Sequence, residues 1–398
     1  MTRRKRRGDG EGTIYKRSDG RWAGQVSLGY DAAGKRIRKS FVRATRREVA
    51  EEIAKALQEV QAGTYIEPTT YTLGRWLDKW LTEYKKPQLK LSTYESYERL
   101  VEGHIKPELG HIPLAKLQAH MVQSFYNEKL ESGRSDGEGG LSTRTVRYLH
   151  VIIRQAIEQA VREGILPRNV ADATSPPVVR NKPMRPLTED ELMKFFEAAQ
   201  DDRLFPAFVV AATTGLRRGE LLGLCWDSVE LDSATIIVQR QLSVLQEGLI
   251  LENTTKSERG RRSIALTDDA VRQLRIHRKR QAEERLLLGE TYQDQGLVFC
   301  KEDGTFIDPR NFTKHFQRIL GEAGLPKVRL HDLRHTHASL LLARDVHPKI
   351  VQERLGHSSI TMTLDLYSHL APGLQEAAAA TLNGLLRQTP KKAQTNDR

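Results

Sequence analysis

Cysteine is scarce in this chain, and long apolar runs are missing from it. The 398 residues include two cysteines, Cys225 and Cys300, which lack the paired spacing of a disulfide framework, a metal site or a redox motif. A reduced, cytosolic setting fits this best. No apolar run approaches the roughly 18 residues that a membrane-spanning helix needs. The N-terminus, Met-Thr-Arg-Arg-Lys-Arg-Arg, has no apolar stretch behind it and does not look like a secretory signal.

Positive charge is what the chain has in excess, and most of it lies near the N-terminus. The formal net charge is +12 and the pI is near 9.6. Residues 1–47 carry 15 Lys and Arg against four Asp and Glu, so the remainder is close to neutral. Such an excess favours a polyanionic partner, although a solvated tail or ribosomal-style arm is the alternative. The length suggests two or three domains.

A small folded domain is predicted within the basic N-terminal segment. Apolar and polar residues alternate in 13–17 and 21–28 around Asp19-Gly20, a strong hairpin turn, and alternate again in 35–42. A helix is expected from Arg46 to about Gln61, with Thr45 as its cap. Three strands backed by one helix present a basic sheet that suits a DNA groove. The predicted DNA contacts of this sheet are Arg17, Arg21, Arg36 and Arg38.

The middle of the chain predicts four or five short helices. Trp76 and Trp80 belong to an apolar stripe at helical spacing, which is typical of a helix core, and a long helix is expected over 143–163. A Pro-rich linker follows over 174–186; it should be extended, and its Arg180 and Lys182 are two more candidate DNA contacts. Thr188-Glu-Asp-Glu191 is a capping box that opens a mainly helical region with a short sheet between Ile236 and Leu266. The predicted fold class is mainly α with small β-sheets, in several domains.

Four short patches in the last half of the chain carry candidate catalytic residues. They are Thr214-Gly-Leu-Arg-Arg-Gly-Glu220, Thr255-Lys-Ser257, His331-Asp-Leu-Arg-His335 and Leu355-Gly-His357, the last followed ten residues on by a tyrosine. Their cationic and imidazole side chains can donate hydrogen bonds to one phosphate, and a tyrosine can attack it. Phosphodiester chemistry without a metal needs such fixed donors. The candidates are Arg217, Lys256, His331, Arg334, His357 and Tyr367.

Each patch also has a plainer interpretation. His331 and Arg334, spaced i, i+3, are expected on one face of a helix, but His331 and His335 have the i, i+4 spacing of some zinc sites. Asp332 stands where the His-Glu-x-x-His motif has glutamate, so His335 and His337 are expected to pack and hydrogen-bond. Lys256 is expected at the turn of a strand hairpin between 250–252 and 261–266, where a lysine is usually just solvated. Its arginine neighbours Arg259, Arg261 and Arg262 are competitors, and Tyr367 on an amphipathic helix can be core.

The order and local motifs of these patches resemble the tyrosine recombinases, the phage-integrase family. The resemblance covers the whole chain, most strongly about residues 185–372. It implies an arm-type DNA-binding domain (1–66), a helical core-binding domain (67–173), the linker (174–186), a catalytic domain (187–372) and a C-terminal helix and tail (373–398). It further implies that Tyr367 forms a 3′-phosphotyrosine, that Lys256 protonates the leaving 5′-oxygen, and that the other candidates hold the phosphorus. Glu220 is then a supporting partner.

The resemblance also implies a function and its partners. The chain is expected to be a site-specific recombinase that integrates or excises a phage or mobile element, using no cofactor and no metal. Expected partners are double-stranded DNA with core and arm attachment sites, three further copies in a tetramer, and an accessory DNA-bending or excision factor, in the bacterial cytoplasm at the nucleoid and away from membranes. A leucine stripe over 374–386 is expected to dock on a neighbouring protomer. The alternatives are a type IB topoisomerase, a metallonuclease and a non-catalytic DNA-binding regulator.

Overall fold

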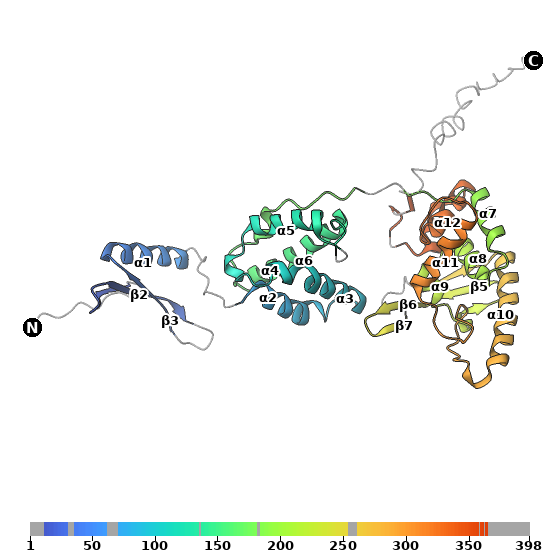
Figure 1. Ribbon diagram of the computed structural model, residues 1–398, viewed down its shortest axis with the longest axis horizontal. Coiled ribbons are helices and arrows are strands. Elements are labelled where there is room, and N and C mark those ends of the chain that lie inside the picture. The colour runs from blue at the N-terminus through green and yellow to red at the C-terminus, as the bar shows by residue number, and fades with distance from the viewer. Residues whose placement is uncertain are drawn as a thin grey trace, which may run out of the picture. The chain divides into compact units, whose positions relative to one another are not determined.

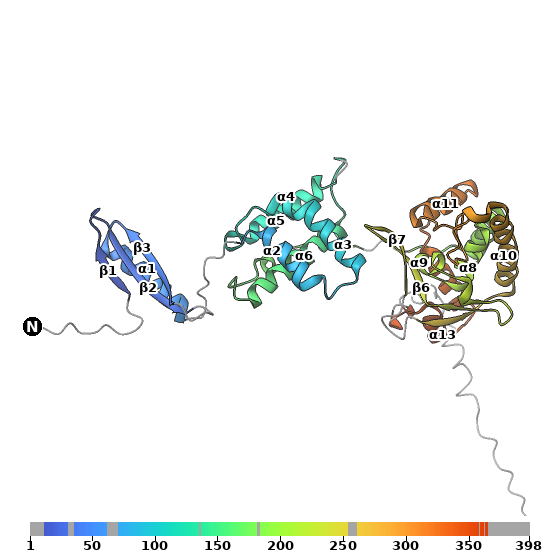
Figure 2. The same cartoon turned by 90° about the horizontal axis from the view of Figure 1, so that it is seen from below.

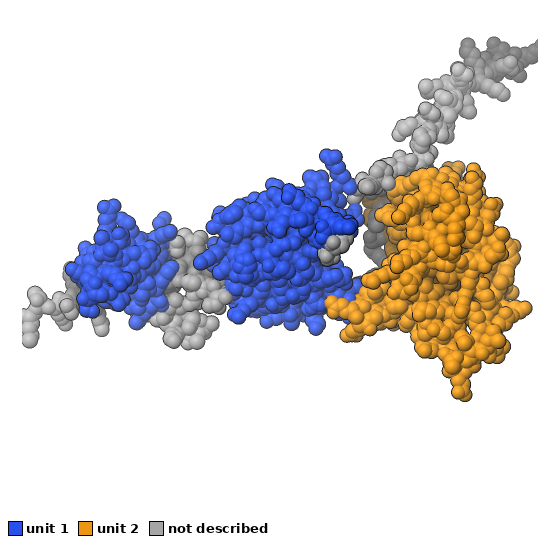
Figure 3. Space-filling view, in the orientation of Figure 1, with its two compact units in different colours: residues 1–181 blue, residues 182–398 orange. Residues whose placement is uncertain are grey.

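The structure is a computed structural model that describes residues 12–30, 36–61, 71–134, 137–180, 184–253, 261–357, 359–361 and 363–364. The chain divides into two compact units, residues 1–181 and 182–398 (Figure 3). Helices dominate and the sheets are small and antiparallel, which confirms the predicted fold class. Among the described residues, no helix combines the length and apolar character that crossing a membrane would require.

The N-terminal part of the first unit is a three-stranded antiparallel sheet covered by one helix (Figure 1). Val26 and Phe41 from the sheet and Val49 and Ile53 from the helix form its core. Thr45 caps the helix as predicted, because its hydroxyl accepts from the Glu48 backbone N–H at 3.2 Å. The elements are β1 (Thr13–Lys16), β2 (Trp22–Tyr30), β3 (Arg36–Arg43) and α1 (Arg46–Gln61).

The remainder of the first unit is a helical bundle. Trp76 and Trp80 are fully buried, which confirms their prediction as helix core, and the Trp76 indole N–H donates to the Ala156 carbonyl at 2.7 Å. Two short π-helical segments, Trp80–Lys85 and Val101–Ile105, extend the helices that precede them. The α-helices are α2 (Leu73–Lys79), α3 (Leu91–Leu100), α4 (Lys106–Leu109), α5 (Ala119–Ser132) and α6 (Thr143–Arg162).

The second unit packs its other helices around α8 (Phe205–Thr214), which is apolar and buried on almost all sides. Phe208 of α8 and Phe195 lie 5.4 Å apart between ring centroids. The predicted capping box of Thr188 and Glu191 opens the first helix. The further helices are α7 (Glu189–Ala199), α9 (Arg218–Leu222), α10 (Asp268–Leu288), α11 (Pro309–Glu322), α12 (Asp332–Ala343) and α13 (Pro348–Leu355).

Two small sheets lie in this unit, and their pairing differs from the prediction. The strands flanking residues 254–260 do not pair with each other: β7 (Gly248–Asn253) pairs with β6 (Arg240–Leu245), and β8 (Arg262–Ala265) pairs with β5 (Thr235–Val238), which also pairs with β4 (Val229–Glu230). The β6–β7 hairpin closes at Gln246-Glu247, which lacks the Asn-Gly or Asp-Gly signal of a two-residue turn. This hairpin and α10 lie on opposite sides of the unit (Figures 1 and 2).

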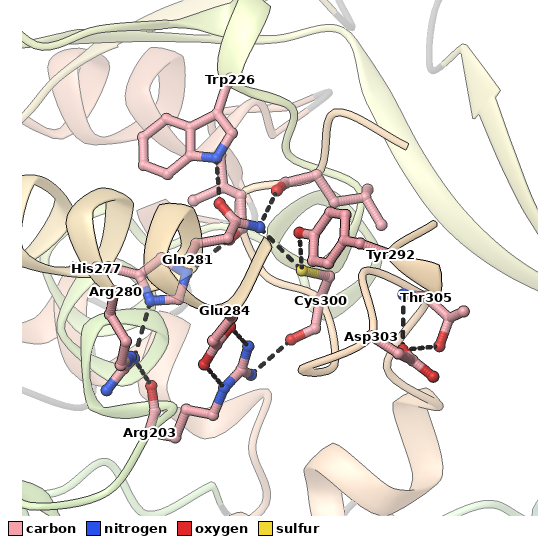
Figure 4. A network of polar contacts seen from close by, with 12 residues as sticks. Arg203, Trp226, His277, Arg280, Gln281, Glu284, Tyr292, Cys300, Asp303 and Thr305 are labelled. Atoms are coloured by element: carbon pink, nitrogen blue, oxygen red, sulfur yellow. Dashed lines mark hydrogen bonds and ion pairs between the residues drawn. The ribbon is translucent and has the colours of Figure 1, made fainter. Parts of the chain in front are cut away.

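A polar network fixes the long helix α10 against the rest of the unit (Figure 4). Glu284 of α10 accepts two hydrogen bonds from Arg203, at 2.8 and 2.6 Å. Gln281 accepts from the Trp226 indole N–H at 2.6 Å, and the buried His277 bonds the Val298 carbonyl at 2.7 Å. Buried polar groups in folded proteins are usually hydrogen-bonded, as Gln281 and His277 are here.

Candidate active site

The described candidate residues of the second unit converge where three helices begin or end. Helix α8 ends at Gly215, α12 begins directly after His331, and α13 ends at Gly356. Both glycines adopt left-handed backbone angles, with φ of 67° and 65°. A Cβ at Gly215 would lie 2.5 Å from the side chain of Leu355, so the end of α13 packs tightly on the end of α8.

Arg334 joins these helix ends from inside the protein. Its Nη1 donates to the Gly215 carbonyl and its Nη2 to the Leu355 carbonyl, both at 2.7 Å. The residue is 3% exposed. Burial, followed by the positive charge of Arg217, lowers the pKa of Arg334, yet a guanidinium still carries its proton at neutral pH. The site therefore holds a buried cation whose anchors are neutral carbonyls.

Arg217 lies between α8 and α9 and is anchored in a similar way. Its Nη2 donates to the Gly356 carbonyl at 3.1 Å and its Nη1 to Glu220 Oε1 at 2.8 Å. The side chain stays 43% exposed, so an anion arriving from solvent can reach it. Helix α9, which begins directly after Arg217, is five residues long, and the Arg217 amide already donates to Glu220 Oε2 at 2.9 Å.

Glu220 supports Arg217, as the sequence suggested, together with an arginine that the sequence did not single out for this role. Arg262 donates to both Glu220 oxygens, at 3.1 and 2.7 Å. Although burial alone raises the pKa of Glu220, the hydrogen bonds and charge of Arg262, and then those of Arg217, hold it at about 2. No local signal marks this pair, because 42 residues separate the two in sequence. The three-residue spacing of Arg217 and Glu220 was the available clue.

His331 lies at the N-cap of α12 rather than within the helix, and Arg334 lies one turn further on. The rings of His331 and His335 meet edge to face, with centroids 4.9 Å apart. Partial burial and the charge of Arg334 lower the pKa of His331; burial and the proximity of His331 lower that of His335 to about 4. Both are neutral near pH 7. Within the described ranges, no three His, Cys, Asp or Glu side chains are grouped to hold a metal ion.

His357 follows directly on the left-handed Gly356. Its Nδ1 lies 3.0 Å from the Thr363 hydroxyl. Burial, then the charges of Arg334 and Arg217, lowers the pKa of His357 to about 4. His331 lies one helical turn before Arg334, and His357 directly follows the Gly356 whose carbonyl accepts from Arg217. The charges of the same two arginines lower the pKa of His331. The structure thus brings four of the six candidates together.

His337 has the packing role that the sequence predicted. Its Nδ1 lies 3.0 Å from the Ala212 carbonyl, and its Nε2 accepts from Arg354 Nε at 3.1 Å. These partners assign the ring proton to Nδ1. The imidazole ties α12 to both α8 and α13 and faces away from solvent, since it is 5% exposed.

The remaining candidates divide into two groups. Lys256, Tyr367 and Lys182 lie outside the described residues, as does the leucine stripe over 374–386. Arg17, Arg21, Arg38 and Arg180 are exposed, and Arg17 and Arg21 both contact Asp19, at 3.3 and 3.7 Å. The backbone of Arg36 lies in β3, opposite Tyr30; its side chain is outside the described part.

Comparisons with known proteins match most of the chain. The profile of the phage integrase family matches residues 185–373, and that of the phage integrase N-terminal SAM-like domain matches residues 72–130. The tyrosine recombinase XerC-like protein of Caldanaerobacter subterraneus subsp. tengcongensis is 31% identical over 378 residues, which cover 90% of this chain and 95% of that relative. The ICEBs1 integrase of Bacillus subtilis is 28% identical over 379 residues, covering 94% and 100%.

Solved structures show a similar fold. The Tn1549 transposon integrase in complex with a circular intermediate DNA superposes with a TM-score of 0.66 at 23% identity, covering 79% of this chain and all of that one. A lambda integrase tetramer bound to a Holliday junction superposes with a TM-score of 0.55 at 21% identity, covering 91% and 96%. At these identities the likeness concerns the fold.

Proposed function

This chain belongs to the phage integrase family of tyrosine recombinases, and we propose that its second unit cuts and rejoins DNA with Tyr367 as the nucleophile. The protein is a site-specific recombinase of the kind found in mobile elements. The assignment of its active site rests on one observation: two guanidinium groups donate to the main-chain carbonyls of two consecutive residues. Arg334 holds the carbonyl of Leu355 and Arg217 that of Gly356, at 2.7 and 3.1 Å, so both cations face one small region.

Two neighbouring cations, of which Arg217 is open to solvent, suit the charge that develops on a phosphodiester during displacement. The pentacoordinate phosphorus carries negative charge on its non-bridging oxygens, and preorganised donors stabilise it without moving. The neutral imidazoles of His331 and His357 add N–H donors beside the arginines. Burial and the arginine charges lower the pKa of each imidazole. The negative charge of an arriving phosphate has the opposite effect: it favours the protonated imidazoles and so strengthens their hydrogen bonds to the phosphate.

The surroundings of the other tyrosine in this unit support Tyr367 as the nucleophile. Residues 182–398 contain two tyrosines, Tyr292 and Tyr367. The Tyr292 hydroxyl lies 3.6 Å from the Cys300 sulfur inside the α10 network, where burial raises its pKa (Figure 4). A phenol with a raised pKa is a poor nucleophile at neutral pH. Tyr367 follows the site residue His357 by ten positions, which leaves it as the candidate of this unit.

The reaction balances without a cofactor. The Tyr367 hydroxyl gives up its proton to water as its oxygen attacks phosphorus, the bond to the 5′-oxygen breaks, and Lys256 supplies the proton that this 5′-oxygen takes up. A 5′-hydroxyl of a partner duplex then attacks the 3′-phosphotyrosine and returns a proton to Lys256, and the released tyrosine oxygen takes up a proton from water. One phosphodiester is exchanged for another, so bond energy is conserved and ATP is not needed.

Strand exchange between two duplexes requires four such sites, and we propose a homotetramer assembled on core and arm attachment sites. The lambda integrase, whose fold is similar, is a tetramer on a Holliday junction. The leucine stripe over 374–386 would connect neighbouring protomers. Deleting the residues after 372 should then spare DNA binding and stop recombination; recombination by the truncated chain would refute that role.

The decisive experiment traps the covalent intermediate on a nicked suicide substrate, from which the cleaved strand diffuses away. The wild-type chain should form a DNA adduct that survives a denaturing gel, and peptide mapping should place the DNA on Tyr367. Tyr367→Phe should bind DNA and form no adduct, while the matched Tyr292→Phe should form one. An adduct on Tyr367→Phe would show that the nucleophile is elsewhere.

The same assay separates the alternatives. A metallonuclease would lose activity in EDTA and form no adduct, whereas the proposed chemistry continues in chelator. A type IB topoisomerase would relax supercoiled DNA and rejoin the original strand, so joining strands from two different duplexes excludes it.

A further inference from the structure

Arg262 lies behind the proposed phosphate donors, and each of its three guanidinium nitrogens donates to a protein oxygen. Nη1 and Nη2 reach both oxygens of Glu220, at 3.1 and 2.7 Å, and Nε reaches the Arg354 carbonyl at 3.0 Å. Its side chain is 8% exposed. Because its guanidinium nitrogens already donate to protein oxygens, Arg262 is not expected to contact DNA.

Glu220 is shared evenly between two arginines. Oε1 accepts from Nη1 of Arg217 and from Nη1 of Arg262, while Oε2 accepts from the Arg217 amide and from Nη2 of Arg262. A carboxylate held on both oxygens cannot rotate without breaking a bond to each partner. The orientation of the Arg217 fork therefore depends on Arg262 through Glu220.

A second arginine continues this connection. Arg354 of α13 donates from Nη2 to the carbonyls of Thr213 and Ala265, at 2.8 and 2.9 Å. Strand β8 is thus tied to α13 twice, once by an arginine from each element. A Cβ at Gly356 would approach Arg262 Cδ and Nη1 to 3.1 Å, so the guanidinium also packs beneath the turn whose carbonyl binds Arg217.

The place of Arg262 in the sequence adds a second consequence. It is the first residue of β8 and follows Lys256 by six positions. The strand end to which the Lys256 segment returns is therefore bonded to the same carboxylate that holds Arg217.

We propose that Arg262 is a positioning residue for DNA cleavage, which orients Arg217 through Glu220 and fixes the strand that follows Lys256 to that carboxylate. This rests on the proposed function, since it assigns Arg262 to the same cleavage reaction. The role differs from a structural one because it predicts a slower chemical step in protein that is fully folded.

The test uses the full-length chain on the suicide substrate under single-turnover conditions. The amplitude of adduct formation reports the active fraction, and the rate constant reports the site. Arg262→Gln should lower the rate constant on the order of 10- to 100-fold, because a small misplacement of a group that positions the reacting atoms can cost about 100-fold in rate. Arg262→Lys keeps the charge but not the fork, so it should recover part of the rate. A loss confined to amplitude or thermal stability would overturn the proposal.

A double substitution tests the route through Glu220. If Arg262 acts by holding that carboxylate, Glu220→Gln with Arg262→Gln should be no slower than Glu220→Gln alone. Rate losses that multiply would show that Arg262 acts independently, and would contradict the coupling. Arg272→Gln, an exposed arginine on α10, is the control and should cleave at the wild-type rate.

The pH profile supplies a readout that a packing defect would not change. Glu220 faces Arg217 and Arg262 directly and feels the charge of Arg334. Without Arg262 the buried carboxyl takes up a proton at a higher pH and releases Arg217. The cleavage rate of Arg262→Gln relative to wild type should therefore fall as pH drops from 7 to 5, by up to about tenfold per pH unit once the carboxyl titrates. A constant ratio across this range would refute the proposal.

Failure of the two proposals can be told apart on the same gel. If the wild-type chain forms an adduct that Tyr367→Phe lacks, and Arg262→Gln cleaves at the wild-type rate, the positioning role alone is wrong. If the wild-type chain forms no adduct, the proposed function is wrong.

Discussion

The arginines of the turn between β1 and β2 and those of the second unit differ in the groups that they contact. Arg17 and Arg21 contact one exposed carboxylate, Asp19, and keep 48% and 66% of their side-chain surface in solvent. Arg262 and Arg334 are nearly buried and are fixed by forked hydrogen bonds. Exposed cations contribute affinity that salt screens, whereas anchored cations contribute geometry. We therefore propose that arginines attract DNA in the first region and position groups for the reaction in the second.

Lys256→Ala should give the largest effect among substitutions that leave the nucleophile in place. Loss of a general acid typically costs about 10²- to 10⁴-fold in rate. A substrate whose bridging 5′-oxygen is replaced by sulfur has a leaving group that needs no proton, and it should restore most of the cleavage rate. If Arg259→Ala or Arg261→Ala shows this selective rescue instead, the general acid has been assigned to the wrong residue.

Arg217→Lys tests whether geometry or charge matters in the catalytic unit. Lysine keeps the charge but cannot hold Glu220 and the Gly356 carbonyl together, so cleavage should slow about 10²- to 10³-fold. DNA affinity at the same salt concentration should change little. A variant that cleaves within about threefold of wild type, as measured by adduct formation, would mean that charge alone suffices there.

Buried and exposed histidines should differ in their effect on the stability of the fold at acid pH. His277 and His337 are buried and burial lowers the pKa of each from 6.5 to about 4, so below about pH 6.5 the unfolded chain binds more protons than the folded one. The contribution of these two histidines to the free energy of unfolding is fully present above that pH. It falls on acidification toward pH 4, by about 1.4 kcal/mol per pH unit for each histidine. Melting temperatures against pH should show this slope. His337→Gln should flatten it, and the exposed His120→Gln should leave it unchanged.

The smallest effect is expected for the exposed arginines. Replacing Arg17, Arg21 and Arg38 with glutamine should weaken binding to arm-site DNA by a modest factor that shrinks at high salt. The slope of log K against log salt should fall by about 0.9 for each DNA phosphate that the variant no longer neutralises. Cleavage of a core-only suicide substrate should not change. Arg47→Gln on α1, an exposed arginine paired with Glu51, is the matched control.

Local signals in the sequence predicted local structure well. The Asp19-Gly20 turn, the capping residues Thr45 and Thr188, and the buried stripe of Trp76 and Trp80 all express rules that operate within one or two helical turns. The motif residues Arg217 and Arg334 were predicted on chemistry and resemblance, and the structure brings them to one turn.

Features that depend on distant partners could not be read in this way. Arg262 and Glu220 are 42 residues apart in sequence. Their pairing depends on β8 joining β5, and no turn motif in the sequence predicts that strand pairing. The predicted hairpin across residues 254–260 was wrong for the same reason. Adjacent strands were assumed to pair, but β6 closes on β7 first and leaves β8 to the other sheet.

Both candidate catalytic guanidinium groups, those of Arg217 and Arg334, donate to main-chain oxygens, namely those of Gly215, Leu355 and Gly356. Such anchors follow the path of the chain and are indifferent to the side chains mounted on it. A substitution that shifts the backbone at either turn would therefore displace the guanidinium groups even if it left every candidate catalytic side chain unchanged.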